Sequence, residues 1–370
     1  MLTFIPDFMR SAAAFVVVLG VLVFVHELGH YLAARWRGVR VEAFSIGFGQ
    51  AITSWTDRHG TVWKLAWLPL GGYVKLHGQE HPQDVPEDVR AAWIPGQTFH
   101  DKPVLSRAII VAAGPAANFL LAMVLFAALF MAIGAPVTLP VIGAVLPDSA
   151  ASRAGLMADD RVVTIARQPI GTFEDLQHII TAHPAQTLVM TIQRDGSDRQ
   201  IEVTTGSRES GGRQVGLLGV RGGAIEYRHV SVPAALWGGV TQTWMITRET
   251  FAGLAQMISG TRGTEELGGP LRIAQLSGQV AQLGVASLIS FIAVLSVNLG
   301  LINLFPVPVL DGGHLLFYLA EALLGRPLPR RTQEYGFKAG LAVLACLFVF
   351  ATWNDLTHLG LFRWVASLIG

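Results

Sequence analysis

The sequence predicts a polytopic α-helical membrane protein with about four transmembrane helices and a folded α+β domain inserted between the second and the third. Of its 370 residues, 51% are hydrophobic and 14% are charged, whereas a soluble chain carries about 25% charged residues. Several charge-free stretches approach the roughly 20 residues that a helix needs to cross a bilayer. Charges return at high density between the second and third of these stretches, as expected for a domain in water.

The first transmembrane helix is predicted over about residues 11–33, since the segment SAAAFVVVLGVLVFV carries no charge. Its last turns contain the run His26-Glu27-Leu28-Gly29-His30. Histidines four residues apart share one face of a helix, so both imidazoles can reach one metal ion, with Glu27 placed to take a proton from water. This H-E-x-x-H pattern is typical of zinc hydrolases. Because ionisable residues in an apolar span are costly and mark functional sites, we favour a metal site over a chance match.

The other transmembrane helices are predicted over about residues 109–133, 285–304 and 339–359. Links between helices that are rich in Lys and Arg face the cytoplasm. These residues are Arg35, Arg37, Arg40, Lys102 and Arg107 in the first link, and Arg326, Arg330 and Arg331 in the last. We therefore expect both termini and the inserted domain to be extracytoplasmic, with the histidines inside the bilayer towards its cytoplasmic side.

The first link contains a predicted membrane-associated β-hairpin region at about residues 39–78. Two strand-like runs, VEAFSIGFG and TVWKLAWLPLGGYVKL, flank a turn at 57–60. Their aromatic content leaves two alternatives, a small soluble β-subdomain or a hairpin that dips into the bilayer interface beside the metal site. The second alternative requires protein or water to satisfy the hairpin's backbone.

The chain is expected to divide into three parts, at residues 1–135, 136–228 and 229–370. The middle part contains short strand-like runs and the helix-like run FEDLQHII, which Thr172 caps three residues before Asp175. The last part begins with an amphipathic segment at about 233–258. Because Arg248 and Glu249 interrupt this segment, we expect an interfacial helix rather than a further span.

A third metal ligand is predicted at Asp311. A catalytic zinc ion normally has three protein ligands and one open position. The single cysteine, Cys346, lies in an apolar run, so the ligands must be His and carboxylate. Asp311 belongs to the run NLFPVPVLDGGH (303–314), whose prolines and glycines are expected to break the helix. A carboxylate on broken backbone at membrane depth is expected to line a polar cavity.

With these motifs the chain resembles the site-2 protease family of intramembrane zinc metalloproteases, and within it the bacterial RseP type. HELGH, the run GPAAN at 114–118, and NLFPVPVLDGG occur in the family's order along the chain. The resemblance implies that His26, His30 and Asp311 bind Zn²⁺ and that Glu27 is the catalytic acid and base. It also implies that Asn303 contacts the substrate backbone or stabilises the oxyanion.

The inserted domain resembles a PDZ domain through the run GAVLPDSAASRAGLMADDRVVTIARQPIGTFEDL. The sequence departs from the family at Asp159-Asp160, where Gly-Asp is common, and in having room for one such domain where RseP-type enzymes carry two. A PDZ-like domain implies a partner peptide or protein segment.

A substrate helix must unwind before it is cut, and its freed backbone groups then need partners in an apolar setting. The alternating run Lys64–Leu76 is predicted to present an exposed edge to which the substrate adds as a strand. Gly71 and Gly72 allow close backbone approach there, so we list them with Tyr73 and Val74 as substrate-binding residues.

The predicted function is hydrolysis of peptide bonds within transmembrane segments, for example of an anti-sigma factor or a remnant signal peptide, in the bacterial inner membrane. The partners are a transmembrane protein substrate and the lipid bilayer; a net charge of +1 gives no reason to expect nucleic acid. The alternative is a membrane-anchored PDZ adaptor or chaperone with a structural or vestigial metal site. Such a protein would not need Glu27, which is not a ligand.

Two residues keep open roles: Asn118 joins helices or belongs to the site, and His314 packs at a helix start or supports the ligands.

Overall fold

The computed structural model describes residues 4–80, 85–210, 213–261, 263 and 268–358. The chain forms two compact units. One, here called the inserted domain, is Phe130–Ala235, and the other, the membrane unit, is the rest of the chain. The inserted domain is wider than the expected 136–228, and a strand pair near its two ends joins residues 135–138 to residues 225–228.

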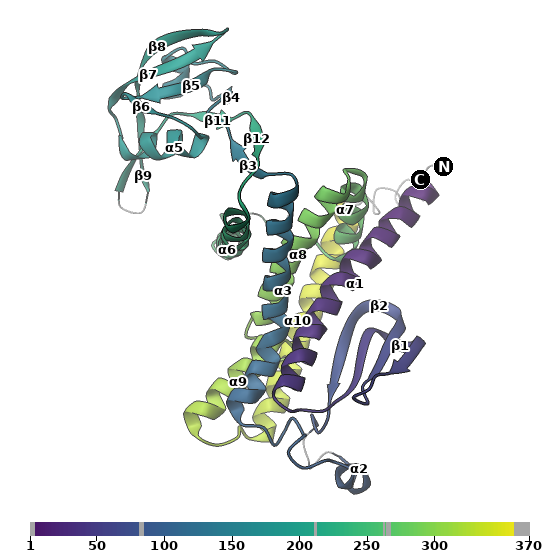
Figure 1. Ribbon diagram of the computed structural model, residues 1–370. Helices are drawn as coiled ribbons and strands as arrows, with labels where there is room; N and C mark the ends of the chain where they lie inside the picture. The colour runs from purple at the N-terminus through teal and green to yellow at the C-terminus, as the bar shows by residue number, and fades with distance from the viewer. Residues whose placement is uncertain (1–3, 81–84, 211–212, 262, 264–267, 359–370) are drawn as a thin grey trace, which may run out of the picture. The chain divides into compact units, whose positions relative to one another are not determined.

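Four helices are long and apolar enough to cross a membrane, so the predicted fold class is confirmed. They are α1 (Phe4–Trp36), α3 (Val104–Ala132), α8 (Val285–Leu304) and α10 (Arg330–His358), and they run alongside one another in the membrane unit (Figure 1). Helix α10 begins well before the expected residue 339. Its first turns are polar and are supported by an Arg330–Glu334 ion pair of 2.7 Å one turn apart.

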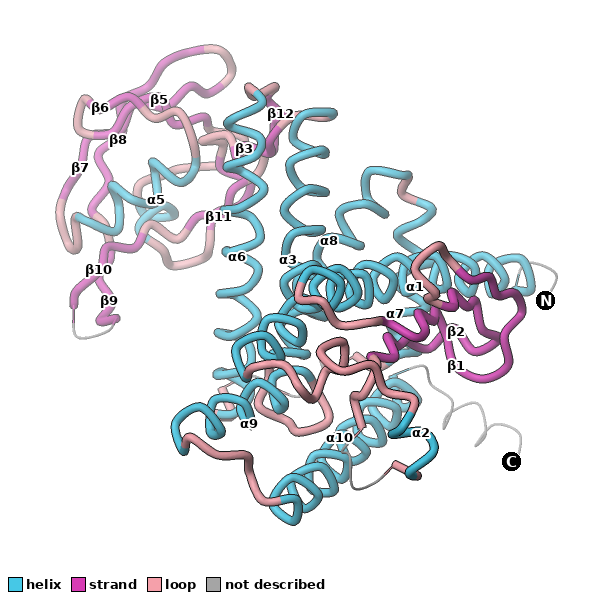
Figure 2. The backbone as a smooth tube through the Cα atoms, turned by 60° about the horizontal axis from the view of Figure 1, so that its bottom comes forward, coloured by secondary structure: helices cyan, strands magenta, loops and turns pink. Residues whose placement is uncertain are grey.

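The hairpin region consists of β1 (Val41–Thr56) and β2 (Val62–Leu76), which lie beside α1 (Figures 1 and 2). Each strand bends and contributes two segments to the sheet, so residues 43–46 pair with 72–75 on one side and with 62–65 on the other. Residues 62–65 also pair with 53–56. The predicted edge at Lys64–Leu76 is therefore wrong in its first part, since 62–65 have partners on both sides, and the edge is confined to 72–76.

The outer part of this sheet exposes large apolar side chains, with Trp67 78% exposed. The others are Phe48, Ile52, Trp55, Leu65 and Leu68. A soluble β-subdomain would bury such a patch, whereas a hairpin in contact with lipid would not. The exposure therefore favours the membrane-associated alternative.

Asp57 in the hairpin turn forms a hydrogen bond to α1. Its carboxylate accepts hydrogen bonds from Tyr31 of α1 (3.2 Å), from the Trp63 indole (3.1 Å) and from the backbone amides of His59 and Thr61. Burial would raise the pKa of Asp57, but these hydrogen bonds outweigh it and lower the pKa to about 2. The sheet is thus held against the helix that carries the H-E-x-x-H motif.

The inserted domain is a β-rich unit with one longer helix. Its strands are β3 (Ala135–Thr138), β4 (Ile142–Val145), β5 (Arg161–Ile165), β6 (Gln168–Pro169), β7 (Thr187–Arg194), β8 (Ser197–Thr204), β9 (Gly206–Ser210), β10 (Arg213–Leu217), β11 (Val220–Gly222) and β12 (Ile225–Arg228). A four-stranded sheet has the order β6-β5-β7-β8, and the pairs β3–β12, β4–β11 and β9–β10 are antiparallel. Helices α4 (Ala150–Arg153) and α5 (Phe173–Ala182) accompany these strands.

The structure explains two sequence features of the inserted domain, the helix cap at Thr172 and the pair Asp159-Asp160. The predicted cap is confirmed, since Thr172 and Asp175 form a reciprocal capping box at the start of α5, which buries Leu176 and Ile180. Asp159 adopts a left-handed conformation with φ 68°, which explains why glycine is common there. The fully buried side chain of Asp160 accepts a 2.6 Å hydrogen bond from Arg194.

Four further helices belong wholly or mainly to the membrane unit: α2 (Glu87–Ala91), α6 (Val232–Ile258), α7 (Pro270–Gln282) and α9 (Asp311–Leu324). Figure 1 shows α6 almost end-on and α3 along its length, so the two helices cross steeply. Gly239 permits the crossing, because a Cβ there would lie 2.3 Å from the Met123 carbonyl oxygen. Helix α7 packs on α1, where Gly278 lies against Ser11.

Candidate functional site

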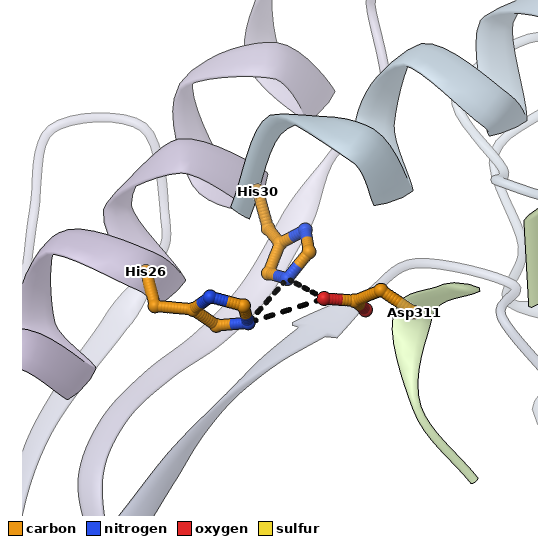
Figure 3. Close-up of side chains that lie close together, drawn as sticks. All are labelled: His26, His30 and Asp311. Carbon is orange, nitrogen blue, oxygen red and sulfur yellow. Dashed lines mark hydrogen bonds and ion pairs between the residues drawn. The ribbon is translucent and has the colours of Figure 1, made fainter. Parts of the chain in front are cut away.

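The three predicted metal ligands lie together in the membrane unit (Figure 3). His26 and His30 come from successive turns of α1, and Asp311 is the first residue of α9. Asp311 Oδ2 lies 3.2 Å from His26 Nε2 and 3.5 Å from His30 Nε2, and the two Nε2 atoms are 3.2 Å apart. All three ligand atoms lie within 4.8 Å of one another.

The chemistry of this cluster fits a zinc ion. Among the described residues, no hydrogen-bond donor satisfies the buried Asp311 Oδ2, which is costly unless a cation does so. Two imidazole nitrogens and one carboxylate oxygen form a donor set found in catalytic zinc sites, which keep a fourth position open.

Glycine residues make room for the cluster between α1 and α3. A Cβ at Gly29 would lie 2.2 Å from the Ala113 carbonyl oxygen, so the helices approach closely there. A Cβ at Gly114 would lie 2.3 Å from His30 Nε2 and 2.9 Å from His26 Cε1. The glycine of the GPAAN run therefore provides the space that the two imidazoles occupy.

The position of Asp311 depends on the run between α8 and α9. Helix α8 ends at Leu304, and the chain is not helical again until Asp311, so the predicted helix break is confirmed. The glycines do not contribute to it as expected, because Gly312 and Gly313 lie inside the first turn of α9. They are needed for packing instead: a Cβ on Gly312 would lie 2.2 Å from the Leu304 carbonyl oxygen.

Glu27 lies where α1 meets the edge segment of the sheet. A Cβ on Gly72 would come within 3.0 Å of Glu27 Cγ and 2.8 Å of Val23 Cγ1, so only glycine fits against this part of α1. The Val74 backbone lies beside the Glu27 carboxylate.

A cavity of about 630 Å³ contains the cluster. It brings together nearly all the predicted site residues: His26, Glu27, His30, Gly72, Tyr73, Val74, Asn303 and Asp311. Gly71 does not line it, because a φ of 143° turns the chain there and its open face meets the Phe48 ring. His314, whose role the sequence leaves open, does line the cavity.

Sequence reasoning missed a polar group on the same cavity wall. Arg107 of α3 forms a 2.6 Å ion pair with Glu321 of α9 and lies 5.0 Å from the centre of the Tyr318 ring. Burial raises the pKa of Tyr318 to about 12, so its hydroxyl stays protonated. Arg107 entered the sequence analysis only as a marker of topology. The lone carboxylate in the run LLFYLAEALL was the available signal for Glu321.

A helical membrane protein with two histidines, an aspartate and a separate glutamate in one cavity has the features of a membrane metalloprotease. The model of peptidase family M50, the family of site-2 proteases, matches residues 14–347. The chain belongs to this family, and it is a zinc-dependent metalloprotease.

Relatives match along almost the whole chain. The Rhizobium meliloti protein R01501 is 43% identical over 358 residues, which are 93% of this chain and 96% of the relative. Metalloprotease MmpA of Caulobacter vibrioides is 35% identical and zinc metalloprotease RasP of Geobacillus kaustophilus is 33% identical. The match to MmpA covers 98% of this chain and 99% of MmpA, and the match to RasP covers 94% of this chain and 98% of RasP. Among solved structures, the PDZ domain of an SdrC-like protein from Listeria monocytogenes matches 22% of this chain and 82% of its own, at 15% identity and a TM-score of 0.20.

Proposed function

We propose that this protein hydrolyses peptide bonds within transmembrane segments of other membrane proteins, with His26, His30 and Asp311 as the zinc ligands. The observation that carries the proposal is the placement of these three side chains and Glu27 in one cavity of the helical membrane unit. A bound zinc ion supplies Lewis acidity, which polarises a carbonyl group and makes water acidic near neutral pH.

Glu27 is the acid and base of this proposal. Its carboxylate accepts the proton of the attacking water and delivers it to the leaving amide nitrogen. Asn303, on the cavity wall near the end of α8, contacts the substrate backbone or stabilises the oxyanion.

The edge segment 72–76 binds the unwound substrate as an added strand. The Leu76 amide donates to the Gln79 side chain, while the His77 amide donates to the backbone carbonyl of Arg40 beside β1. Because amides alternate between the two sides of a strand, the even-numbered residues face away from β1. An extended substrate would therefore pair with Gly72 and Val74, and Tyr73 would contribute its side chain alone.

The substrate class that we infer is a single membrane-spanning segment, such as that of an anti-sigma factor or a remnant signal peptide. Pairing through backbone groups is insensitive to side-chain identity and suits varied segments. The PDZ-like domain binds a peptide or protein segment and limits access to the cavity. Among the residues that the structure describes, the cluster of potential ligands lies in the membrane unit, which supports a non-catalytic role for this domain.

Cleavage of a helical membrane peptide by the detergent-purified protein tests the proposal. We expect cleavage inside the apolar segment, loss of cleavage with a chelator, and recovery when zinc is restored. The alternative of a PDZ adaptor with a structural metal site predicts binding without cleavage under every condition. Absence of cleavage in zinc-loaded, folded protein, with several membrane peptides, would support that alternative.

The proposed orientation places both termini and the inserted domain outside the cytoplasm, in a bacterial inner membrane. It rests on the Lys and Arg side chains of the two links, including Arg107 and Arg330. We expect a reporter at the C-terminus to read as extracytoplasmic and one inserted at Pro327 as cytoplasmic. A cytoplasmic C-terminus in the same assay would overturn the orientation.

A further inference from the structure

Asn118 of α3 is a fully buried polar residue to which the proposed mechanism assigns no role. Its amide nitrogen Nδ2 lies 3.1 Å from His26 Nδ1, and its buried Oδ1 has no hydrogen-bond partner within the described part of the chain. The Ser296 hydroxyl of α8 donates to the Asn118 backbone carbonyl at 2.8 Å. The backbone thus joins two helices, while the side chain faces a proposed zinc ligand.

The two histidines have the same arrangement relative to α3. Each directs Nε2 towards Asp311 and Nδ1 towards α3, where His30 Nδ1 meets the Ile110 carbonyl oxygen at 2.9 Å. A carbonyl oxygen only accepts, so His30 carries its proton on Nδ1 and keeps the Nε2 lone pair for a metal. His26 needs an acceptor at the equivalent position, and Asn118 is the group that lies there.

An amide offers that acceptor in one of its two orientations. With Nδ2 towards His26, Asn118 would donate to Nδ1 and leave the proton on Nε2, where it would block metal binding. A half-turn about χ2 exchanges the two ends of the amide and places Oδ1 against Nδ1–H. This orientation gives the orphaned oxygen a partner and leaves Nε2 free.

We propose that Asn118 is a positioning residue whose amide oxygen accepts from His26 Nδ1–H and so holds His26 in its metal-binding tautomer. The inference rests on the proposed metal site and deepens it. Ligand histidines generally donate their second ring N–H to such an acceptor, and its loss typically costs 10–100-fold in metal affinity.

The test compares Asn118→Asp with Asn118→Leu in the full-length protein and measures zinc affinity by competition with a chromogenic chelator. Aspartate keeps an acceptor at the same place, whereas leucine keeps the volume and removes it. We expect the aspartate variant to bind zinc at least as tightly as the wild type. We expect the leucine variant to bind it about 10–100-fold more weakly.

A role in helix packing alone predicts the opposite order, because leucine suits an apolar interior and an added carboxylate does not. Asn298→Leu is the matched control: this asparagine of α8 accepts from Thr250 at 3.1 Å and should leave zinc affinity unchanged. If Asn118→Leu does not fold, Asn118→Ala removes the same acceptor without a steric demand.

Two results would overturn the inference: a leucine or alanine variant with wild-type zinc affinity, or an aspartate variant more than tenfold weaker than the wild type. Either leaves the proposed function intact. A wild-type protein that binds no zinc would instead refute the proposed metal site itself.

Discussion

Glu27→Gln is expected to lower kcat by about 10²–10⁴-fold, the range that a positioned general acid and base contributes. Glutamine has nearly the same shape, so the packing of Glu27 against Gly72 and Val23 stays possible. Because Glu27 is not one of the three clustered ligands, the variant should retain about one zinc ion per chain. His26→Ala and Asp311→Ala, in contrast, should lose zinc and activity together. Cleavage rate and metal content, measured on the same preparation, separate the two outcomes.

Glu42→Gln is the matched control for the same substitution. Glu42 of β1 pairs with Lys75 at 2.9 Å and with His77 at 2.8 Å, and it does not line the cavity. Its change should leave turnover within a few-fold of the wild type. Near-normal turnover in Glu27→Gln would mean that another group moves the proton.

Features that depend on local sequence could be predicted. The i, i+4 spacing of His26 and His30 places both on one helical face whatever surrounds them, and the capping box at Thr172 involves residues three apart. The four spans follow from apolar composition and length. The proximity of Asp311 to the two histidines could be expected, because a zinc site needs a third protein ligand and the run around Asp311 resembles a motif of the family.

Features that depend on contacts between distant segments could not be predicted. Asn118 reaches His26 across 92 positions of the chain, and Arg107 reaches Glu321 across 214. An isolated asparagine in an apolar helix gives no indication of the neighbour it meets. The glycines of α9 misled for a different reason: their low helix propensity was visible, but not their close packing against the carbonyl groups of Leu304 and Val307.

The strand pairing at the sheet edge could not be predicted from the sequence either. Sequence alternation indicated a strand over Lys64–Leu76, but it does not reveal which neighbours pair or which amides face outwards. Tyr73 pairs with Ser45 of β1. Because amides alternate along a strand and the His77 amide points towards the β1 side, the Tyr73 amide also faces β1. Tyr73→Pro would therefore disrupt the sheet itself, and it does not test strand addition.

Val74→Pro is the informative substitution at this edge. It removes an outward amide at a position where proline is tolerated, since edge strands accept proline on their open side. If the substrate pairs there, we expect cleavage to fall about 5–150-fold with zinc content unchanged, while Val74→Ala has a mild effect. Removing one partner of a hydrogen bond leaves the other group unpaired in an apolar setting, which costs about 1–3 kcal/mol. This cost corresponds to a decrease of about 5–150-fold in the cleavage rate.

The Val74 amide also contacts Glu27, so proline could act on the acid and base rather than on the substrate. A change in the substrate alone separates the two effects. Replacing one backbone N–H of the substrate by an ester oxygen, a few residues from the scissile bond, removes a donor from the strand and leaves the enzyme intact. Under strand addition, esters at alternate positions slow cleavage of the wild type and those between them do not, because only alternate residues face the edge. An equal response at all positions, together with equal tolerance of proline and alanine at Val74, would exclude pairing at this edge.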